Sequence, residues 1–482
     1  MRKLFLIASL AACLIGAAPA HAAVEPGLVL GGNFFTSQAS YQAVASTGAK
    51  WVRVFLYRDQ METSRGHYNL AIIAAYRSAL ARFAGMGVKV EMVVVGTPSW
   101  ESGSSDNLVP PDPAGYASFA RWLSGQLGGT VSAYEVWNEQ DAPLWWHGDT
   151  APAGYAALLK AAYPAFKSGS SDAAVLVGGL TGNDSDYLDN LLGQGVAGSF
   201  DGVAVHSDTA CNLNSPYDFQ KDNNGVLTFS SFLGYKELER VLAAHGVDGI
   251  KIWFTELGWS TSRATCDQGV WAGQKDGGVP EDQQALFLKQ AYHCLSVDEA
   301  DVGPSFWFTL DDLGSADTPN NRFGLIRPDG SHKPAFDAFS DYAHNGDHLT
   351  DPCGDFAGPS IAMLELGDAK GANRLTSSWS KQLHVKVQAT DGHVVGRITL
   401  YLDGKKIRNF TAQQAGVVTA EMNIDQAKRL PAGAHRLTVF AKDMKGNSSS
   451  QDFTVTKLGV AGAGDAKRGR ARHHKPKHRR RR

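Results

Sequence analysis

Tyr134-Glu135-Val136-Trp137-Asn138-Glu139 is the stretch of sequence from which the fold is inferred. Together with the apolar positions from Val131 onward, its β-branched and aromatic residues predict a buried strand. The strand ends on an amide and a carboxyl, and a buried carboxylate needs a counter-charge or a chemical role. A second stretch, Ile250-Lys251-Ile252-Trp253-Phe254-Thr255-Glu256, has the same form and ends on another glutamate. Two strand-terminal glutamates far apart in the sequence predict one site with paired carboxylates, which suits glycosidic bond cleavage.

Apolar runs alternate with helical patterns from Leu28 to about Asn345. The predicted strands cover residues 28–34, 51–56, 88–95, 131–138, 174–180, 200–206, 250–256 and 304–309. The predicted helices cover residues 71–86, 116–127, 153–168, 232–245, 281–297 and 334–344. Eight strands that alternate with helices predict an α/β fold, a (β/α)8 TIM barrel. An open doubly wound sheet is the alternative, but no G-x-G-x-x-G follows the first strand and no P-loop is present.

The long loops of this region all follow predicted strands. They cover residues 96–113, 140–152, 207–230 and 257–279. In a barrel these loops surround the catalytic face, at the carboxyl ends of the strands.

The 482 residues are enough for two or more domains, and the first segment is a predicted signal peptide. Arg2 and Lys3 precede an apolar run, and Ala20-His21-Ala22 fits a cleavage site after Ala22. Residues 1–22 are therefore expected to be removed from a secreted protein. Lipoprotein processing at Cys13 is the alternative, although the apolar run continues past that residue. No later stretch is long enough to span a membrane.

The character of the sequence changes after the predicted barrel, which is expected at 23–350. Short alternating strands separated by turns rich in glycine and aspartate predict a small β-sandwich at 358–458. Its predicted strands cover residues 383–389, 397–402, 417–422, 435–441 and 452–456. A tail follows at 459–482, and residues 463–482 hold ten of the 46 lysines and arginines.

This tail has nothing to bury, so disorder is expected. Its charge suits an anionic cell-wall polymer or polysaccharide, and a solvated tail without a partner is the alternative.

Four cysteines remain after the signal peptide, and an even number in an exported chain predicts disulfides. We expect Cys211 to pair with Cys266, because the loops after strands six and seven are neighbours in a barrel. Cys294 then pairs with Cys353, which ties the helix after strand seven to the segment after the last helix. Free buried cysteines are the alternative.

The two strand-end motifs resemble those of a known enzyme group. With Trp137-Asn138-Glu139 on strand four and Phe254-Thr255-Glu256-Leu257-Gly258-Trp259 on strand seven, the barrel resembles clan A glycoside hydrolases. It is most similar to family 39 and to cellulase-like members of family 5. The resemblance implies a retaining mechanism, with Glu139 as the acid/base and Glu256 as the nucleophile.

The same resemblance implies roles for four further residues. Asn138 is expected to bond the 2-hydroxyl of the sugar, and Arg53 to lie beside the nucleophile and keep it ionised. His206 matches a site histidine, with a structural histidine as the alternative. Trp307 is expected to form the platform under the reacting sugar.

The sequence departs from this pattern two residues after His206, where the relatives often have a tyrosine and this chain has Asp208. Tyr217, in the same loop, is a candidate substitute.

Other tryptophans fit either substrate binding or packing. We expect Trp100, Trp145, Trp146 and Trp259 to line the substrate site. No Cys/His spacing predicts a metal site, and no cofactor is expected.

After the barrel, residues 431–437 resemble the turn before a late strand of bacterial immunoglobulin-like modules. Such a module spaces domains, adds stability or binds carbohydrate.

Two functions from different classes remain open. The first is a secreted, monomeric retaining β-glycosidase acting on a polysaccharide or oligosaccharide. The second is a carbohydrate-binding or wall-associated barrel that does not catalyse. The presence of both glutamates favours the enzyme, while xylan, mannan, glucan and an exopolysaccharide all stay possible as substrates.

Overall fold

The computed structural model describes residues 24–32, 37–222, 224–267, 269–298, 300–368 and 375–459. The predicted signal peptide, Cys13 and the basic tail from residue 460 lie outside these residues. The chain divides into two compact units, Met1–Asp355 and Phe356–Arg482, and each is described by itself.

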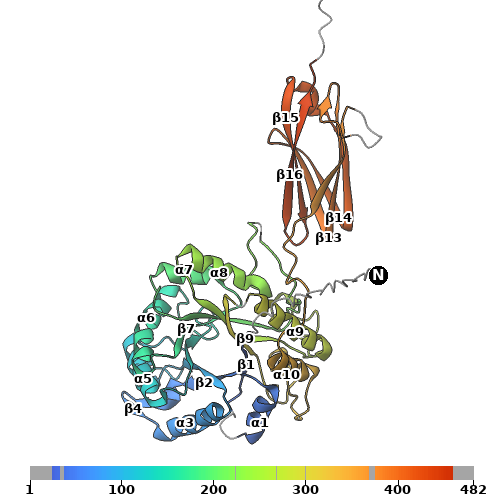
Figure 1. Cartoon of the computed structure of the whole chain (residues 1–482). Helices are drawn as coiled ribbons and strands as arrows, with labels where there is room; N and C mark the ends of the chain where they lie inside the picture. Colours follow the sequence, from blue (N-terminus) through green and yellow to red (C-terminus); the bar gives the residue numbers. More distant parts are fainter. Residues whose placement is uncertain are drawn as a thin grey trace, which may run out of the picture. The chain divides into compact units, whose positions relative to one another are not determined.

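The first unit is built on eight parallel strands that close into a barrel, as predicted (Figure 1). The strands are β1 (Pro26–Val29), β2 (Trp51–Tyr57), β5 (Lys89–Val95), β6 (Ala133–Asn138), β7 (Ala174–Thr181), β8 (Gly202–Thr209), β9 (Lys251–Trp259) and β10 (Val302–Trp307). Their order around the barrel is β1-β10-β9-β8-β7-β6-β5-β2, with β1 pairing β2 to close it. The closed order excludes the open doubly wound alternative.

Helices surround these strands (Figure 1). They are α1 (Gln38–Thr47), α3 (Leu70–Gly85), α5 (Pro113–Leu127), α6 (Pro152–Gly169), α7 (Ser185–Gly193), α8 (Tyr235–Ala244), α9 (Glu281–Val297) and α10 (Pro334–Asn345). Their starts follow local rules: the Asn69 side chain caps α3, and Asp112 accepts from Gly115 N while Pro113 opens α5. The helices α1 and α7 were not among those predicted.

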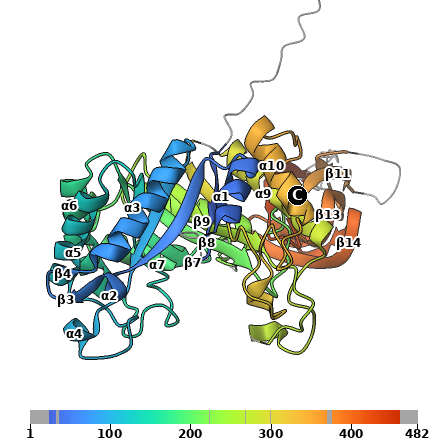
Figure 2. The ribbon, with the colours of Figure 1, turned by 90° about the horizontal axis from the view of Figure 1, so that it is seen from below.

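Short elements complete the first unit. They are α2 (Arg58–Met61), β3 (Glu62–Ser64), β4 (His67–Tyr68), α4 (Ser99–Ser102), η1 (Phe232–Gly234), η2 (Gly269–Trp271) and η3 (Pro319–Asn321). Figure 2 shows long connections at one end of the barrel, with α4 among them. Because α4 directly follows β5, these connections lie at the carboxyl ends of the barrel strands.

Both predicted disulfides are present. Cys211 bonds Cys266, with Cα atoms 5.8 Å apart, and Cys294 bonds Cys353, with Cα atoms 5.3 Å apart. The first joins the loop after β8 to the loop after β9, and the second joins α9 to the segment after α10. Within the residues that the structure describes, no helix has the length and apolar character needed to cross a membrane.

The second unit is all-β, as predicted, with its own buried core that includes Trp379. Its elements are β11 (Ser360–Gly367), β12 (Ser378–Trp379), β13 (Leu383–Leu402), β14 (Lys405–Ile424), η4 (Asp425–Arg429), β15 (Gly433–Asp443) and β16 (Ser448–Lys457). The order is β11-β13-β15-β16-β12, and β14 pairs with β13.

Two of the strands predicted for this unit, 383–389 and 397–402, are one continuous strand, β13. Register shifts against β14 lie within it, so the chain bends without ending the strand. The immunoglobulin-like assignment stays a prediction.

Candidate active site

Arg53 is the centre of the site. It lies on β2, is 0% exposed, and would be unstable there without carboxylate partners. Its Nη1 donates to Glu256 Oε1 at 2.5 Å, and its Nη2 donates to Asn138 Oδ1 at 2.9 Å. The carboxylates outweigh burial and raise the pKa of Arg53, so it is a permanent cation. Arg53 therefore links the ends of β6 and β9.

Two buried glutamates beside Arg53 were not predicted as site residues. Glu135 on β6 accepts from Arg53 Nε at 3.0 Å and from Nη2 at 3.2 Å, and it also accepts from Gly179 N. Glu91 on β5 lies 3.1 Å from Arg53 Nε. Burial and the nearby charge of Glu135 raise the pKa of Glu91 well above its usual range, which favours the neutral form of this carboxyl group. Glu135, which accepts two hydrogen bonds from the guanidinium, fixes the orientation of Arg53.

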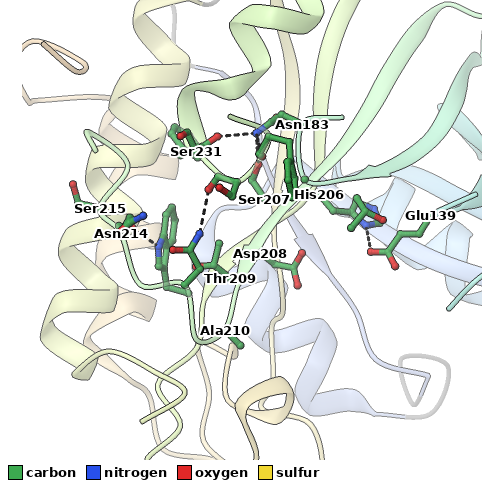
Figure 3. Close-up of a pocket in the computed structure, with 17 residues that line it drawn as sticks. Glu139, Asn183, His206, Ser207, Asp208, Thr209, Ala210, Asn214, Ser215 and Ser231 are labelled. Carbon is green, nitrogen blue, oxygen red and sulfur yellow. Dashed lines mark hydrogen bonds and ion pairs between the residues drawn. The ribbon is translucent and has the colours of Figure 1, made fainter. Parts of the chain in front are cut away.

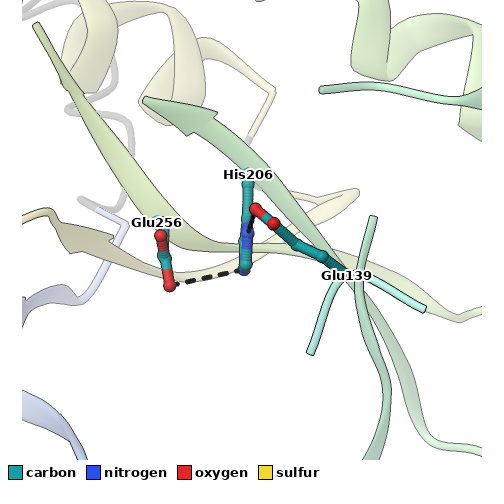
Figure 4. Close-up of side chains that lie close together, drawn as sticks. All are labelled: Glu139, His206 and Glu256. Carbon is teal, nitrogen blue, oxygen red and sulfur yellow. Dashed lines mark hydrogen bonds and ion pairs between the residues drawn. The ribbon is translucent and has the colours of Figure 1, made fainter. Parts of the chain in front are cut away.

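His206 connects the two predicted catalytic glutamates. Its Nδ1 lies 2.8 Å from Glu139 Oε1, and its Nε2 lies 3.8 Å from Glu256 Oε1. Figure 4 shows the imidazole between the two carboxylates. One carboxylate oxygen of Glu139 and one of Glu256 lie within 4.8 Å of each other. The two strand ends therefore form one site.

The charge of His206 follows from these neighbours. Burial lowers its pKa, but the carboxylates of Glu256 and Glu139 outweigh burial and raise the pKa to about 9. At neutral pH His206 is therefore an imidazolium, and its Nδ1–H donates to Glu139 Oε1.

The backbone at the end of β6 has an unusual conformation. Trp137 has φ of 70° and Glu139 has φ of 45°, in the left-handed region that non-glycine residues seldom adopt. The backbone N–H of Glu139 donates to Gly179 O at 2.9 Å on the neighbouring strand. Such strain concentrates at functional sites, and here it orients the Glu139 side chain.

A cavity of about 310 Å³ opens beside Glu139 (Figure 3). We call it the Asp208 pocket; it is lined by Glu139, His206 and Asp208, and by the residues around Thr209 and Asn214. Burial, followed by the charge of Glu256, raises the pKa of Asp208 to about 7. The residue that replaces the expected tyrosine is therefore a third carboxyl group of the site.

Tyr217 does not take the place of that tyrosine. Its ring lies 6.3 Å from the His293 ring, and burial with the charges of Asp351 and Asp347 raises its pKa to about 12. These neighbours belong to α9 and to the segment after α10, not to the catalytic strands.

The predicted substrate-binding tryptophans have different surroundings. Trp307 is 0% exposed and donates to Phe323 O, and Trp259 is 1% exposed but lines the Asp208 pocket. Trp146 is 2% exposed and packs edge-on against Trp137. Trp307 and Trp146 thus have no exposed ring face for a sugar in this structure.

The other two are half-buried. Trp145 stacks on Phe55 with ring centroids 5.9 Å apart. Trp100 lies under Arg58 and Arg65 and donates to Glu62 O. Trp100 therefore belongs to a separate cluster, in which Arg58 pairs with glutamates of its own.

Glu139, His206 and Glu256 each offer an atom that a metal ion could bind. However, Arg53 already donates to the Glu256 oxygen and His206 is bonded to Glu139. A divalent cation there would lie against a guanidinium, so this set fits proton transfer better than metal binding.

Comparisons with known proteins show which solved structures have a similar fold. No family model and no curated protein matches the sequence. The chain is similar to a family 39 glycoside hydrolase from the gut symbiont Bacteroides cellulosilyticus WH2, with 18% identity over 83% of this chain and 79% of that chain and a TM-score of 0.54. It is similar to a GH39 enzyme from Xanthomonas axonopodis pv. citri, with 15% identity over 85% and 92% of the two chains and a TM-score of 0.51. A monomeric β-xylosidase from Caulobacter crescentus CB15 has 16% identity over 84% and 96% and a TM-score of 0.50. At these identities the likeness concerns the fold.

Proposed function

We propose that this protein is a retaining glycoside hydrolase that cleaves β-glycosidic bonds in a polysaccharide or oligosaccharide. The observation that carries the proposal is the approach of a Glu139 oxygen to a Glu256 oxygen within 4.8 Å. Retaining glycosidases hold their carboxyl groups about 5–5.5 Å apart, whereas inverting enzymes leave about 6.5–9.5 Å for a water molecule. The solved structures with the same fold, named as family 39 hydrolases and a β-xylosidase, support this class of reaction.

In the first step Glu256 attacks the anomeric carbon while Glu139 protonates the glycosidic oxygen. The bond from carbon to that oxygen breaks, and a bond from carbon to Glu256 forms. Arg53 Nη1, 2.5 Å from Glu256 Oε1, holds the carboxyl group of the nucleophile in position. In the second step Glu139 takes a proton from water, which attacks the same carbon and releases Glu256.

The proton for the leaving group is held by His206 and Glu139 together. The bond between His206 Nδ1 and Glu139 Oε1 is 2.8 Å long, so a proton on the imidazole can pass to the carboxylate as charge develops on the leaving oxygen. Because Asn138 Oδ1 accepts from Arg53, its amide N–H groups are the part of this side chain that would donate to a sugar hydroxyl.

We further propose that the protein acts as a secreted monomer, with the basic tail held near an anionic polymer. The predicted signal peptide and the two disulfides support export, because disulfides persist in oxidising compartments.

The test is turnover of an aryl β-glycoside panel, followed by NMR of the first sugar released from a natural-type substrate. We expect retained β configuration, and Glu256→Ala should abolish turnover while the protein stays folded. Glu139→Ala should impair poor leaving groups most, and added azide should restore the rate with a β-glycosyl azide as product. An inverted α product would refute the mechanism, and a folded wild type without turnover on any glycoside would refute the enzyme.

A further inference from the structure

The Asp208 pocket continues into a second cavity. This Trp271 pocket, of about 640 Å³, is lined by Val270, Trp271 and Lys275 among others. Four residues line both cavities, and they are Ala210, Asn212, Asn214 and Ser230. The two cavities therefore adjoin along these residues, and we call the path from Glu139 to Trp271 the groove.

The position of Glu139 gives this groove a direction. The proposed acid protonates the oxygen of the leaving group, so the leaving group lies on the side of that carboxyl. Glu139 lines the Asp208 pocket, and Figure 3 shows it at one end while Asn214 and Ser215 lie at the other. Asn214 also lines the Trp271 pocket. A chain that enters at Glu139 and follows the groove is therefore the departing part of the substrate.

The walls near Glu139 suit the hydroxyl groups of a sugar. Most of their polar side chains are hydroxyls and amides, such as Ser207, Thr209 and Asn212. The buried atoms of the described residues that have no hydrogen-bond partner include two from this wall, Thr209 Oγ1 and Asn183 Oδ1. Buried polar groups of this kind usually have a partner, and a sugar hydroxyl supplies one.

Trp271 supplies an aromatic surface at the far end. Its side chain is 42% exposed, and the Lys275 ammonium lies 4.2 Å from its ring centroid. The segment is fixed by the bond of Cys266 N to Lys275 O at 2.9 Å and by the disulfide to Cys211. A ring held in place before binding loses little entropy when a sugar stacks on it.

We propose that this groove binds the leaving-group end of a β-linked oligosaccharide, with at least two sugars and the distal one stacked on Trp271. The inference rests on the proposed glycosidase function. Its consequence is that the enzyme cuts two or more sugars away from the reducing end of its substrate.

The first test uses cello-, manno- and xylo-oligosaccharides of three to six sugars that carry a fluorescent label at the reducing end. Labelled fragments of two or more sugars are expected as the first products of any series that is cleaved. A labelled monosaccharide as the main first product would overturn the inference while leaving the glycosidase proposal intact. No cleavage of these or of aryl glycosides would instead count against the glycosidase proposal.

The second test replaces the aromatic surface. The ratio of kcat/KM for the best labelled oligosaccharide to that for an aryl β-glycoside should fall about tenfold in Trp271→Ala, as expected for one stacked sugar. Leu286→Ala is the matched control, because Leu286 is 48% exposed but lies on the outer helix α9. Circular dichroism and the melting temperature establish that both variants fold. An unchanged ratio in folded Trp271→Ala, or an equal fall in Leu286→Ala, would overturn the role of Trp271.

Discussion

The shared proton of His206 and Glu139 predicts the alkaline limit of the activity. The pKa of His206 is about 9 instead of the ordinary 6.5, which corresponds to about 3 kcal/mol in favour of the charged imidazole. For a substrate with a poor leaving group, kcat/KM should therefore stay level through neutral pH and fall above about pH 9, as the proton is lost. In His206→Asn the proposed acid, Glu139, must hold its own proton, so the fall should begin at least about one pH unit lower.

The assay is the pH dependence of kcat/KM between pH 5 and 10 for one poor and one activated leaving group. His245→Asn is the control, because His245 pairs with Asp189 at 2.7 Å on the outside of the barrel. The alkaline fall should be weaker for the activated substrate and absent in Glu139→Ala. If wild type and His206→Asn lose activity at the same pH, the shared proton is not the source of the limit.

The same shift affects stability. A histidine whose pKa is higher in the folded state stabilises the fold fully below its unfolded pKa of about 6.5. This contribution is lost as the pH rises through about 9, so the free energy of unfolding should fall over that window in wild type. Urea unfolding at pH 6 and pH 9.5 should show a smaller difference in His206→Asn.

Three further outcomes are expected from the buried groups. Glu91→Gln should change the free energy of unfolding by less than about 1 kcal/mol, because the raised pKa of Glu91 favours the neutral form that glutamine resembles. Glu135→Gln should cost about 3–5 kcal/mol, because it breaks the paired hydrogen bonds to buried Arg53. Equal costs in urea titrations would contradict this difference. Asp208→Asn should stabilise the protein at pH 8 by about 1–2 kcal/mol and have little effect at pH 4, because the raised pKa of Asp208 penalises only its ionised form. A difference in melting temperature between wild type and Asp208→Asn that is the same at both pH values would argue against this. Replacing both Cys294 and Cys353 by serine should lower the free energy of unfolding by about 4 kcal/mol, the value for a closed loop of this length. A double variant with the melting temperature of wild type would refute this prediction.

The barrel and the pairing of Glu139 with Glu256 were predictable because each rests on a short-range signal. A glutamate at the end of an apolar run can be recognised within a single predicted strand. Eight predicted strands that alternate with helices leave few topologies other than a barrel. Glu91 and Glu135 were missed because a charged residue in the middle of a strand can be assigned a partner only when Arg53, on another strand, is placed beside it. In the barrel Arg53 and Glu91 are direct register partners, a relation that the sequence does not contain.

The aromatic residues mark the limit of sequence reasoning. Trp145 and Trp146 are adjacent, yet one is half-buried and the other is in the core. Adjacent side chains in a loop can face different directions, and the elements that each one packs against are distant in the sequence. Trp271 follows no motif, and only the fold of its disulfide-bonded loop places it at the end of a groove.

The ion pairs of Arg53 also bear on how the molecule assembles. Arg53, Glu91 and Glu135 come from β2, β5 and β6, which are adjacent in the barrel and lie in the first part of the chain. This half balances its own interior charge. The later half contributes Glu256, whose counter-ion is Arg53, and burying that carboxylate alone would cost several kcal/mol. Burial of Glu256 is therefore coupled to closure of the barrel, because the carboxyl group on β9 meets Arg53 only when β2 of the amino-terminal half is in place across the barrel.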